Sequence, residues 1–210
     1  MHYRIGTRGS KLALVQSEYV KRRMEEAYPE DTFELVIIKT TGDKVTDKPL
    51  AAIGTKGLFV KEIEEALLSG SIDMAVHSMK DMPAECATGL TFAKAWKRED
   101  CRDVLILKTA GSFSKLPSGA VIGTGSLRRA CQLAMLRPDI QFTAIRGNVD
   151  TRINKLMDDS YGLDGIVLAA AGLNRLGRSS EITEYLDPEV VIPAPAQGVL
   201  AIETAEVNTE

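Results

Sequence analysis

Short apolar runs alternate with amphipathic segments along most of the chain. Runs rich in β-branched and aliphatic residues predict strands over residues 3–6, 33–39, 72–76, 90–95, 104–107, 121–123, 142–145, 165–168 and 200–203. Apolar residues with helical spacing predict helices over 11–28, 58–68, 127–136 and 149–157, with a short helix after residue 169. This alternation predicts an α/β fold.

Local signals define the ends of the first helix. Ser10 is a suitable N-cap, and Pro29 ends the helix because proline lacks a backbone donor. The expected buried face consists of Leu12, Val15, Tyr19, Val20 and Met24. The amides at the helix start, together with Arg8, would form an anion site, although an ordinary capped helix explains them as well.

The segment 72–83, IDMAVHSMKDMP, changes from apolar to polar within a few residues. The polar residues that follow its apolar run are His77, Ser78, Lys80 and Asp81. Polar groups that follow a buried strand lie at the carboxyl edge of an α/β sheet, where such proteins bind ligands. A solvated turn with an incidental ion pair explains the segment equally well when it is taken alone.

Arginines occur at several predicted junctions between a strand and the next helix. They are Arg8, Arg128 with Arg129, Arg146 with Arg152, and Arg175. A positive side chain in the first turn of a helix opposes the helix dipole. We therefore predict that a bound anion compensates Arg128 and Arg129. A solvated surface explains each arginine alone, whereas their convergence favours an anion site.

The charge distribution also favours an anionic ligand. The 210 residues carry a net charge of −3, which gives no general attraction to nucleic acid or to a membrane. Residues 121–152 nevertheless hold five arginines against two aspartates, a local net charge of +3. Aromatic residues make up only 5% of the chain, which argues further against nucleic-acid binding.

Cysteine and histidine are too few to indicate a metal site or a disulfide framework. Three cysteines are widely spaced, and two histidines lie far apart. We predict a reducing, cytoplasmic compartment. Neither a signal peptide nor an apolar run near the roughly 20 residues of a membrane span is found in the sequence. We expect a monomer with no metal, no nucleic acid and no membrane partner.

Two connectors, near residues 96–103 and 192–198, divide the predicted elements into two lobes. The first lobe comprises 1–97 plus 197–210, and the second comprises 98–196. We expect the strand ends of both lobes to face a shared cleft, with Asp81 among the arginines. An acid in such surroundings stays ionised and can stabilise a cation or transfer a proton. This interpretation requires Asp81 to face the cleft and not bulk water.

Seven segments resemble, in order, those of the porphobilinogen deaminase (hydroxymethylbilane synthase) family. They are RIGTRGSKLAL, GTKGLFVKEIE, DMAVHSMKDMP, GTGSLRRACQL, IRGNVDTRINKL, AAAGLNRLG and PAPAQGVLAIE. The resemblance covers nearly the whole chain. It implies head-to-tail condensation of four porphobilinogen molecules with release of ammonia, in tetrapyrrole (haem) biosynthesis. It also implies two lobes of periplasmic-binding-protein type II topology joined by two hinge strands.

The resemblance assigns roles to residues of this sequence. Asp81 would be the catalytic carboxylate. Carboxylates of the substrate and of a dipyrromethane cofactor would be bound by Arg8, Ser10, Ser78, Lys80, Thr124, Ser126, Arg128, Arg129, Arg146, Gly147, Arg152 and Arg175. Asp43 and Lys56 would belong to a mobile loop over the cleft, and Gln197 and Gly198 to the hinge and the cleft floor.

The sequence departs from the family pattern in three places. Gly125 stands where many members have serine, and Ala196 replaces a frequent glycine. The family's third, α+β domain, whose cysteine carries the cofactor, is missing from the 210 residues. We therefore expect this chain alone to be inactive and not covalently loaded through Cys86, Cys101 or Cys131. The alternative function is a two-lobed carboxylate or oxyanion receptor without catalysis.

Overall fold

A computed structural model describes residues 1–44, 60–93, 96–109 and 111–206. Its backbone contacts divide the chain into two units, Met1–Arg98 with Val199–Glu210, and Glu99–Gly198. The sequence analysis placed residues 197 and 198 in the first lobe. In the structure they belong to the second unit, because Gln197 donates hydrogen bonds to Cys101 O and to Asp103 Oδ1 there, both at 2.8 Å.

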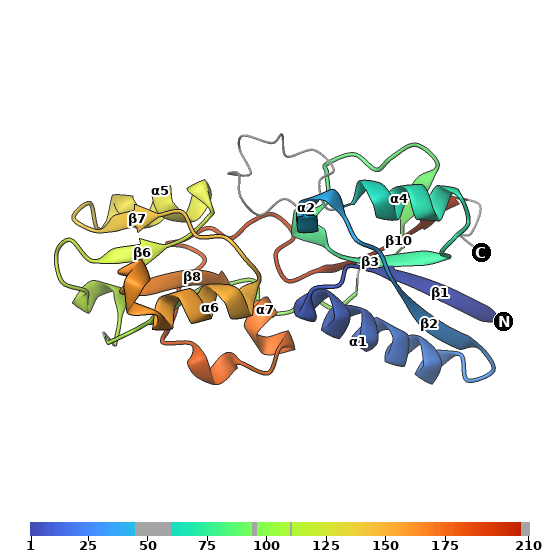
Figure 1. The fold of residues 1–210 in the computed structure, drawn as a ribbon, viewed down its shortest axis with the longest axis horizontal. Coiled ribbons are helices and arrows are strands. Elements are labelled where there is room, and N and C mark those ends of the chain that lie inside the picture. Colours follow the sequence, from blue (N-terminus) through green and yellow to red (C-terminus); the bar gives the residue numbers. More distant parts are fainter. Residues whose placement is uncertain (45–59, 94–95, 110, 207–210) are drawn as a thin grey trace. The chain divides into compact units, whose positions relative to one another are not determined.

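Unit 1 is built on a five-stranded sheet with the strand order β2-β1-β3-β10-β4 (Figure 1). Its strands are β1 (His2–Thr7), β2 (Thr32–Ile37), β3 (Met74–Ser78), β4 (Leu90–Phe92) and β10 (Leu200–Ala205). β1 runs parallel to β2 and β3. β10 runs antiparallel to both β3 and β4, so the returning segment lies inside the sheet.

Helices cover both faces of the unit 1 sheet. α1 (Lys11–Ala27) buries Val20 against Ile5 and Phe33 on one face, and α4 (Lys61–Leu68) buries Ile63 on the other. The short helix α2 (Thr41–Lys44) and the 3₁₀ turn η1 (Met79–Asp81) complete the unit.

One residue of α1 that was predicted to be buried is exposed. Tyr19 is 41% exposed and packs edge-to-face on Trp96, because the buried side of the helix is centred on Gln16, Ser17 and Val20. Ser17 Oγ satisfies its hydrogen-bonding need by donating to Thr7 Oγ1 at 2.7 Å.

Unit 2 also contains a five-stranded sheet, with the strand order β7-β6-β8-β5-β9. Its strands are β5 (Asp103–Leu107), β6 (Val121–Gly123), β7 (Gln141–Thr143), β8 (Gly165–Ala169) and β9 (Glu184–Tyr185). β6 runs parallel to β7 and β8, and β5 runs antiparallel to β8. The sequence analysis missed β9, whose two residues are too few to form an apolar pattern.

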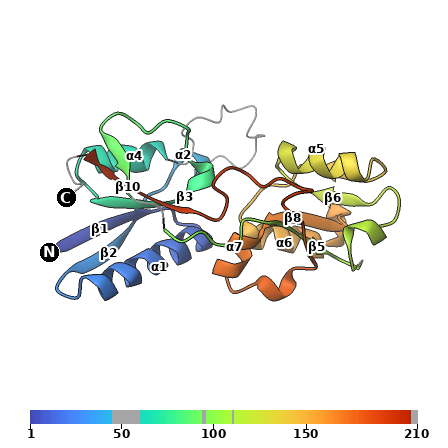
Figure 2. The ribbon, with the colours of Figure 1, turned by 180° about the vertical axis from the view of Figure 1, so that it is seen from behind.

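The helices of unit 2 lie on the two faces of its sheet, as the view from behind also shows (Figure 2). α5 (Leu127–Leu136) packs Leu133 into one core. α6 (Val149–Met157) and α7 (Ala170–Arg175) pack Ile153 and Leu173 into the other. Short 3₁₀ turns are η2 (Phe113–Lys115), η3 (Asp159–Tyr161) and η4 (Ser179–Glu181).

Polar residues lie at one edge of each sheet, because the parallel strands of that sheet end there. In unit 1, the carboxyl ends of β1 and β3 meet at the edge that carries Ser78. In unit 2, the carboxyl ends of β6, β7 and β8 share an edge. Since β5 is antiparallel to β8, its first residue, Asp103, lies at that same edge beside Ala169. Among the described residues, no helix combines the length and the apolar character needed to cross a bilayer.

Candidate functional site

The carboxyl edge of unit 1 is held in place by α1. Ser10 caps this helix by accepting a hydrogen bond from the Ala13 amide at 3.3 Å, as predicted. Gln16, buried in the same helix, donates from Nε2 to Ser78 Oγ at 3.1 Å. Ser78 is therefore partly engaged inside unit 1, and its position at the end of β3 is fixed relative to α1.

Asp81 lies on the 3₁₀ turn that leaves this edge. The Met79 amide donates to Val199 O at 3.0 Å, so the returning segment fixes the turn from one side. Lys80 and Asp81 are both exposed. Unit 1 itself does not enclose the carboxylate of Asp81, and its expected position in a cleft between the lobes stays a prediction. Exposure leaves the carboxylate accessible to a ligand.

The two residues predicted to lie in a loop over the site are only partly described. Asp43 belongs to the short helix α2. Lys56 lies outside the described residues. The start of α2 is tied to α4, since the Thr41 amide donates to Glu62 Oε1 at 2.8 Å.

The N-terminus of α5 forms the centre of the unit 2 edge. Thr124 Oγ1 accepts from the Ser126 amide at 3.2 Å, and Ser126 Oγ caps the helix by accepting from the Arg129 amide at 3.4 Å. A cavity of about 200 Å³ opens here, lined by Thr124, Gly125, Ser126, Leu127, Ala130, Phe142, Thr143 and Ala144. A side chain at Gly125 would place its Cβ 3.0 Å from Ile145 O, so glycine suits this wall.

Arg128 and Arg129, predicted to be compensated by a bound anion, both form ion pairs with one acid of the chain itself, Asp103. Arg129 is buried and donates from Nε and Nη2 to Asp103 Oδ1, at 3.0 and 2.8 Å. Its Nη1 donates to Val167 O at 3.3 Å. Arg129 is therefore directed into the core of unit 2, which corrects the expectation that it binds a ligand.

Arg128 is the more accessible arginine of the two. Its side chain is 26% exposed, and its Nη1 lies 2.7 Å from Asp103 Oδ2. This contact is an ion pair without the alignment of a good hydrogen bond. Arg128 also donates to Ile192 O. The side chain of Arg128 is thus only partly covered by the rest of unit 2.

Asp103 is a polar residue that the sequence analysis missed, because it lies in the segment 96–103, which was interpreted only as a connector between the lobes. Burial alone would raise the pKa of its carboxyl group. Arg129, Arg128 and Gln197 nevertheless hold that pKa below its ordinary value. The signal available in the sequence was an acid directly before a wholly apolar strand.

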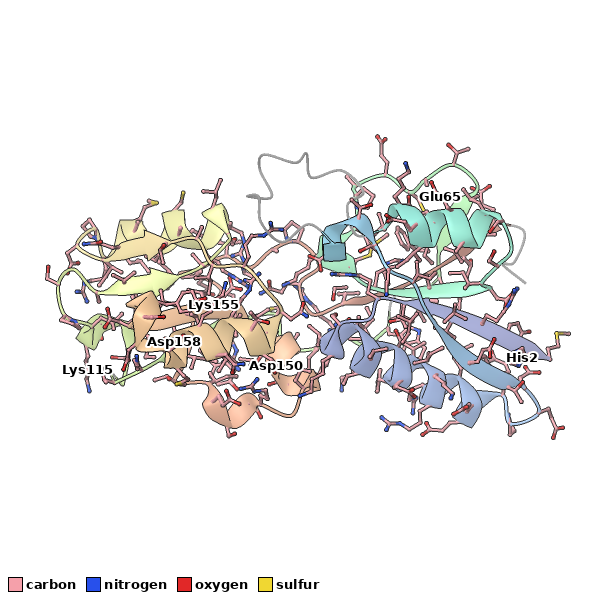
Figure 3. The ribbon with its side chains drawn as sticks, viewed as in Figure 1. His2, Glu65, Lys115, Asp150, Lys155 and Asp158 are labelled. Carbon is pink, nitrogen blue, oxygen red and sulfur yellow. The ribbon has the colours of Figure 1, made fainter. Side chains whose placement is uncertain are left out.

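The turn after β7 positions two further arginines. Gly147 has φ +117°, a region that favours glycine, and Arg152 Nε donates to Gly147 O at 2.8 Å. Lys155 Nζ donates to Arg146 O at 3.2 Å. Arg146 and Arg152 are both half-buried. Figure 3 shows Lys155 along the same helix, α6, that carries Arg152.

Arg175, Gln197 and Gly198 meet where the chain crosses into and out of unit 2. Arg175 Nη2 donates to Gly198 O at 2.7 Å. Gly198 has φ +92°, and a Cβ there would lie 2.4 Å from Glu99 O, so only glycine fits. Gln197 is 1% exposed. In this structure Gln197 is therefore bonded within unit 2 and not displayed to solvent.

The described residues contain no group of three or more His, Cys, Asp or Glu side chains arranged to hold a metal ion. The groups assembled at the edges of the two sheets are instead arginine, lysine, hydroxyl and carboxylate. Such groups bind carboxylates and transfer protons.

Sequence comparisons identify close relatives. Residues 3–210 match the family model described as "Porphobilinogen deaminase, dipyromethane cofactor binding domain". A porphobilinogen deaminase of Lachnospira eligens is 99% identical over 210 residues, which are 100% of this chain and 71% of that protein. Porphobilinogen deaminases of Syntrophus aciditrophicus and Clostridioides difficile are 54% and 56% identical, over 99% and 97% of this chain and 67% of each relative.

Structural comparisons identify the fold. A putative lipoprotein from Actinomyces odontolyticus aligns with a TM-score of 0.56 and 15% identity, covering 98% of this chain and 83% of that one. The methionine binding protein MetQ aligns with a TM-score of 0.51 and 15% identity, covering 99% and 84%. The predicted α/β fold of periplasmic-binding-protein type II character is thereby confirmed.

Proposed function

Because this chain belongs to the porphobilinogen deaminase family, we propose that Asp81 is the carboxylate that manages charge and protons in the family's reaction. The family is a transferase of tetrapyrrole synthesis, and its substrate carries an aminomethyl group together with acetate and propionate side chains. Each condensation breaks the bond between the methylene carbon and the amine, and releases ammonia. The carbon left behind becomes cationic and forms a carbon–carbon bond to the next pyrrole.

Asp81 suits both parts of this chemistry. An ionised carboxylate beside the forming methylene-pyrrole cation stabilises it electrostatically. The same carboxylate can accept the proton that the attacked pyrrole carbon loses when the new bond has formed. Its exposed position on η1 lets a substrate approach, and Lys80 beside it adds a positive group for a substrate carboxylate.

The binding of substrate carboxylates, on which this proposal depends, is supported by the cavity at the start of α5. Thr124 and the helix cap Ser126 line this cavity, and the first turn of the same helix carries Arg128, whose side chain is 26% exposed. Helix amides and a guanidinium fork both favour a carboxylate. Arg146 and Arg152 add further positive charge in the same unit. The shared cleft between the lobes stays a prediction.

The same donor set fits the dipyrromethane cofactor, whose pyrrole rings carry the same acetate and propionate groups. Arg128, Ser126 and Thr124 would hold its carboxylates. When bound, the cofactor supplies the pyrrole terminus that successive substrates extend. We further propose that none of Cys86, Cys101 and Cys131 bonds to it covalently. Intact-mass spectrometry of the chain checks this, and an adduct of dipyrromethane mass would contradict it.

Two measurements test the role of Asp81. Calorimetric titration of porphobilinogen into the 210-residue chain should give affinities within about threefold for the wild type and Asp81→Ala, because the arginines supply the binding. Porphobilinogen consumption, assayed with the remaining segment of a full-length relative supplied separately, should fall at least about 100-fold in Asp81→Ala.

The alternative, a carboxylate receptor without catalysis, predicts a different result. It expects porphobilinogen to bind to the wild type and to Asp81→Ala, with no consumption of substrate even when the remaining segment and its cofactor are supplied. Cytoplasmic location and a monomeric state are further proposals, and light scattering of the purified chain checks the second.

A further inference from the structure

Asp103 is fully buried at the edge of unit 2 where the three parallel strands end. A buried carboxylate is stable only when hydrogen bonds and opposite charges compensate it. Its Oδ1 accepts from Arg129 Nε and Nη2 and from Gln197 Nε2, at 2.8–3.0 Å. Its Oδ2 lies 2.7 Å from Arg128 Nη1. One acid therefore organises groups from two separate segments of the unit.

The charges of this group do not balance. Asp103 contributes one negative charge, and Arg128 and Arg129 contribute two positive charges, so one positive charge remains. Arg129 is buried and directs all three of its guanidinium nitrogens to acceptors inside the unit. The uncompensated charge is consequently presented by Arg128, whose side chain is 26% exposed.

We propose that Asp103 is a positioning residue that holds Arg129 inside unit 2 and fixes Arg128 as the arginine that binds a substrate carboxylate. The proposal rests on the proposed function and deepens it, because it distinguishes two adjacent arginines that the sequence treats alike. Gln197 contributes to the same arrangement, since its side-chain amide donates a hydrogen bond to Asp103 Oδ1.

The contact geometry explains how Arg128 can be held by Asp103 and still bind a carboxylate of the substrate. Only its Nη1 approaches Asp103 Oδ2 and Ile192 O. A guanidinium has five N–H donors in a rigid planar fork, so donors remain for a second carboxylate. A fixed fork loses less conformational freedom on binding than a mobile side chain does.

A simpler role for Asp103 would be to neutralise the buried charge of Arg129. The two roles predict different behaviour for the charge-neutral double variant Asp103→Asn/Arg129→Gln, which removes one buried acid and one buried base together. If Asp103 only neutralises Arg129, the double variant should bind porphobilinogen like the wild type. If Asp103 positions Arg128, binding should weaken although the chain remains folded.

Calorimetric titration of porphobilinogen into the 210-residue chain provides the first test. We expect the double variant to melt cooperatively and to bind at least about tenfold more weakly than the wild type. Arg137→Gln/Asp139→Asn is the matched control, because it removes an ion pair of 2.6 Å elsewhere in unit 2. The control should keep wild-type affinity. Equal affinities for the double variant and the wild type would overturn the proposal.

Arginine labelling with phenylglyoxal, read by peptide mass spectrometry, gives a second readout that does not require porphobilinogen to bind. In the wild type, Arg128 should be labelled at least about tenfold faster than buried Arg129. In the double variant, Arg128 labelling should accelerate, whereas the control should leave it unchanged. Similar labelling of Arg128 and Arg129 in the wild type would refute the proposal even if the double variant did not fold.

The two readouts separate this inference from the proposed function. A wild-type chain that does not bind porphobilinogen, but shows the predicted difference in arginine labelling, would contradict the proposed function and support the positioning role. A chain that binds porphobilinogen, but in which Arg128 and Arg129 are labelled at similar rates, would contradict the positioning role and support the proposed function.

Discussion

His77 and Glu203 lie diagonally across the antiparallel strands β3 and β10, with 3.2 Å between His77 Nε2 and Glu203 Oε2. Their side chains are 5% and 0% exposed. The thiol of Cys86 donates a weak hydrogen bond to Glu203 Oε1 at 3.6 Å. This buried contact joins the strand that leads to Asp81 to the strand that completes the sheet of unit 1.

Replacing Glu203 with Gln should destabilise the chain. Glutamine places an NH2 group where one carboxylate oxygen now lies beside His77 or Cys86, so one of these buried polar contacts is lost. We expect the free energy of unfolding to fall by about 1–3 kcal/mol, measured by urea denaturation at neutral pH. Glu65→Gln is the control, because Glu65 is 64% exposed on α4 and should change stability little (Figure 3). Equal stability losses in the two variants would contradict the prediction.

The thiol of Cys86 should react slowly. Burial, followed by the nearby Glu203 carboxylate, raises its pKa to about 11. At pH 8 only about 0.1% of this group would be thiolate, the form that attacks electrophiles. Iodoacetamide should therefore modify exposed Cys131 first, and the rate at Cys86 should rise about tenfold per pH unit from 7.5 to 9.5. A rate at Cys86 that levels off within that range would show that the pKa is not raised.

Ala196 should gain stability when it is replaced by glycine. Its φ of +55° lies in the left-handed region, which costs a residue with a Cβ about 1–2 kcal/mol. Glycine relieves this strain but increases the freedom of the unfolded chain, so we expect a net gain of about 0.5–1 kcal/mol. Thermal denaturation should show a midpoint raised by about 1–4 °C.

Ala194→Gly in the same connector serves as the matched control. Ala194 is not among the described non-glycine residues with positive φ, so glycine there brings only the entropic cost. A midpoint lowered in both variants would contradict the strain at Ala196.

Asp103 should make the stability of the chain sensitive to acid. Burial acts to raise its pKa, but Arg129, Arg128 and Gln197 hold the folded-state pKa below the ordinary value. Asp103 then binds a proton more readily in the unfolded chain than in the folded chain. The stabilisation that ionised Asp103 gives the fold is therefore present above about pH 4 and is lost as pH falls through the folded-state pKa.

The charge-neutral double variant Asp103→Asn/Arg129→Gln lacks this titration. Its free energy of unfolding, measured in urea between pH 5 and pH 3, should fall less steeply than that of the wild type. Parallel curves for the two proteins would show that Asp103 does not contribute to the acid sensitivity.

Helix ends were well predicted from the sequence because their signals are local. The bounds of α5 and α6 agree with the predicted 127–136 and 149–157, and the predicted N-cap, Ser10, accepts the expected hydrogen bond. Each of these features depends on residues within one turn of the helix.

Features of the site that depend on distant residues were harder to predict. Arg128 and Arg129 are adjacent residues of the same type, so the local sequence does not distinguish them. Burial against Asp103, 26 residues away from Arg129 in the sequence, directs Arg129 inward. The turn that carries Asp81 is fixed by a hydrogen bond from the Met79 amide to the distant Val199 O. Neither the pairing partner of an arginine nor such a distant backbone contact is encoded by local periodicity.

The placement of β10 governs how a nascent chain can reach this fold. β4 is hydrogen-bonded to the sheet of unit 1 through β10, whereas residues 99–198 form unit 2 without interruption. A ribosome therefore releases every residue of unit 2 before Leu200–Ala205 can enter the sheet of unit 1. Until then β3 exposes an unpaired edge, the kind of edge that chaperones shield and that aggregation exploits. Translation that stops short of Leu200 would leave that edge permanently open.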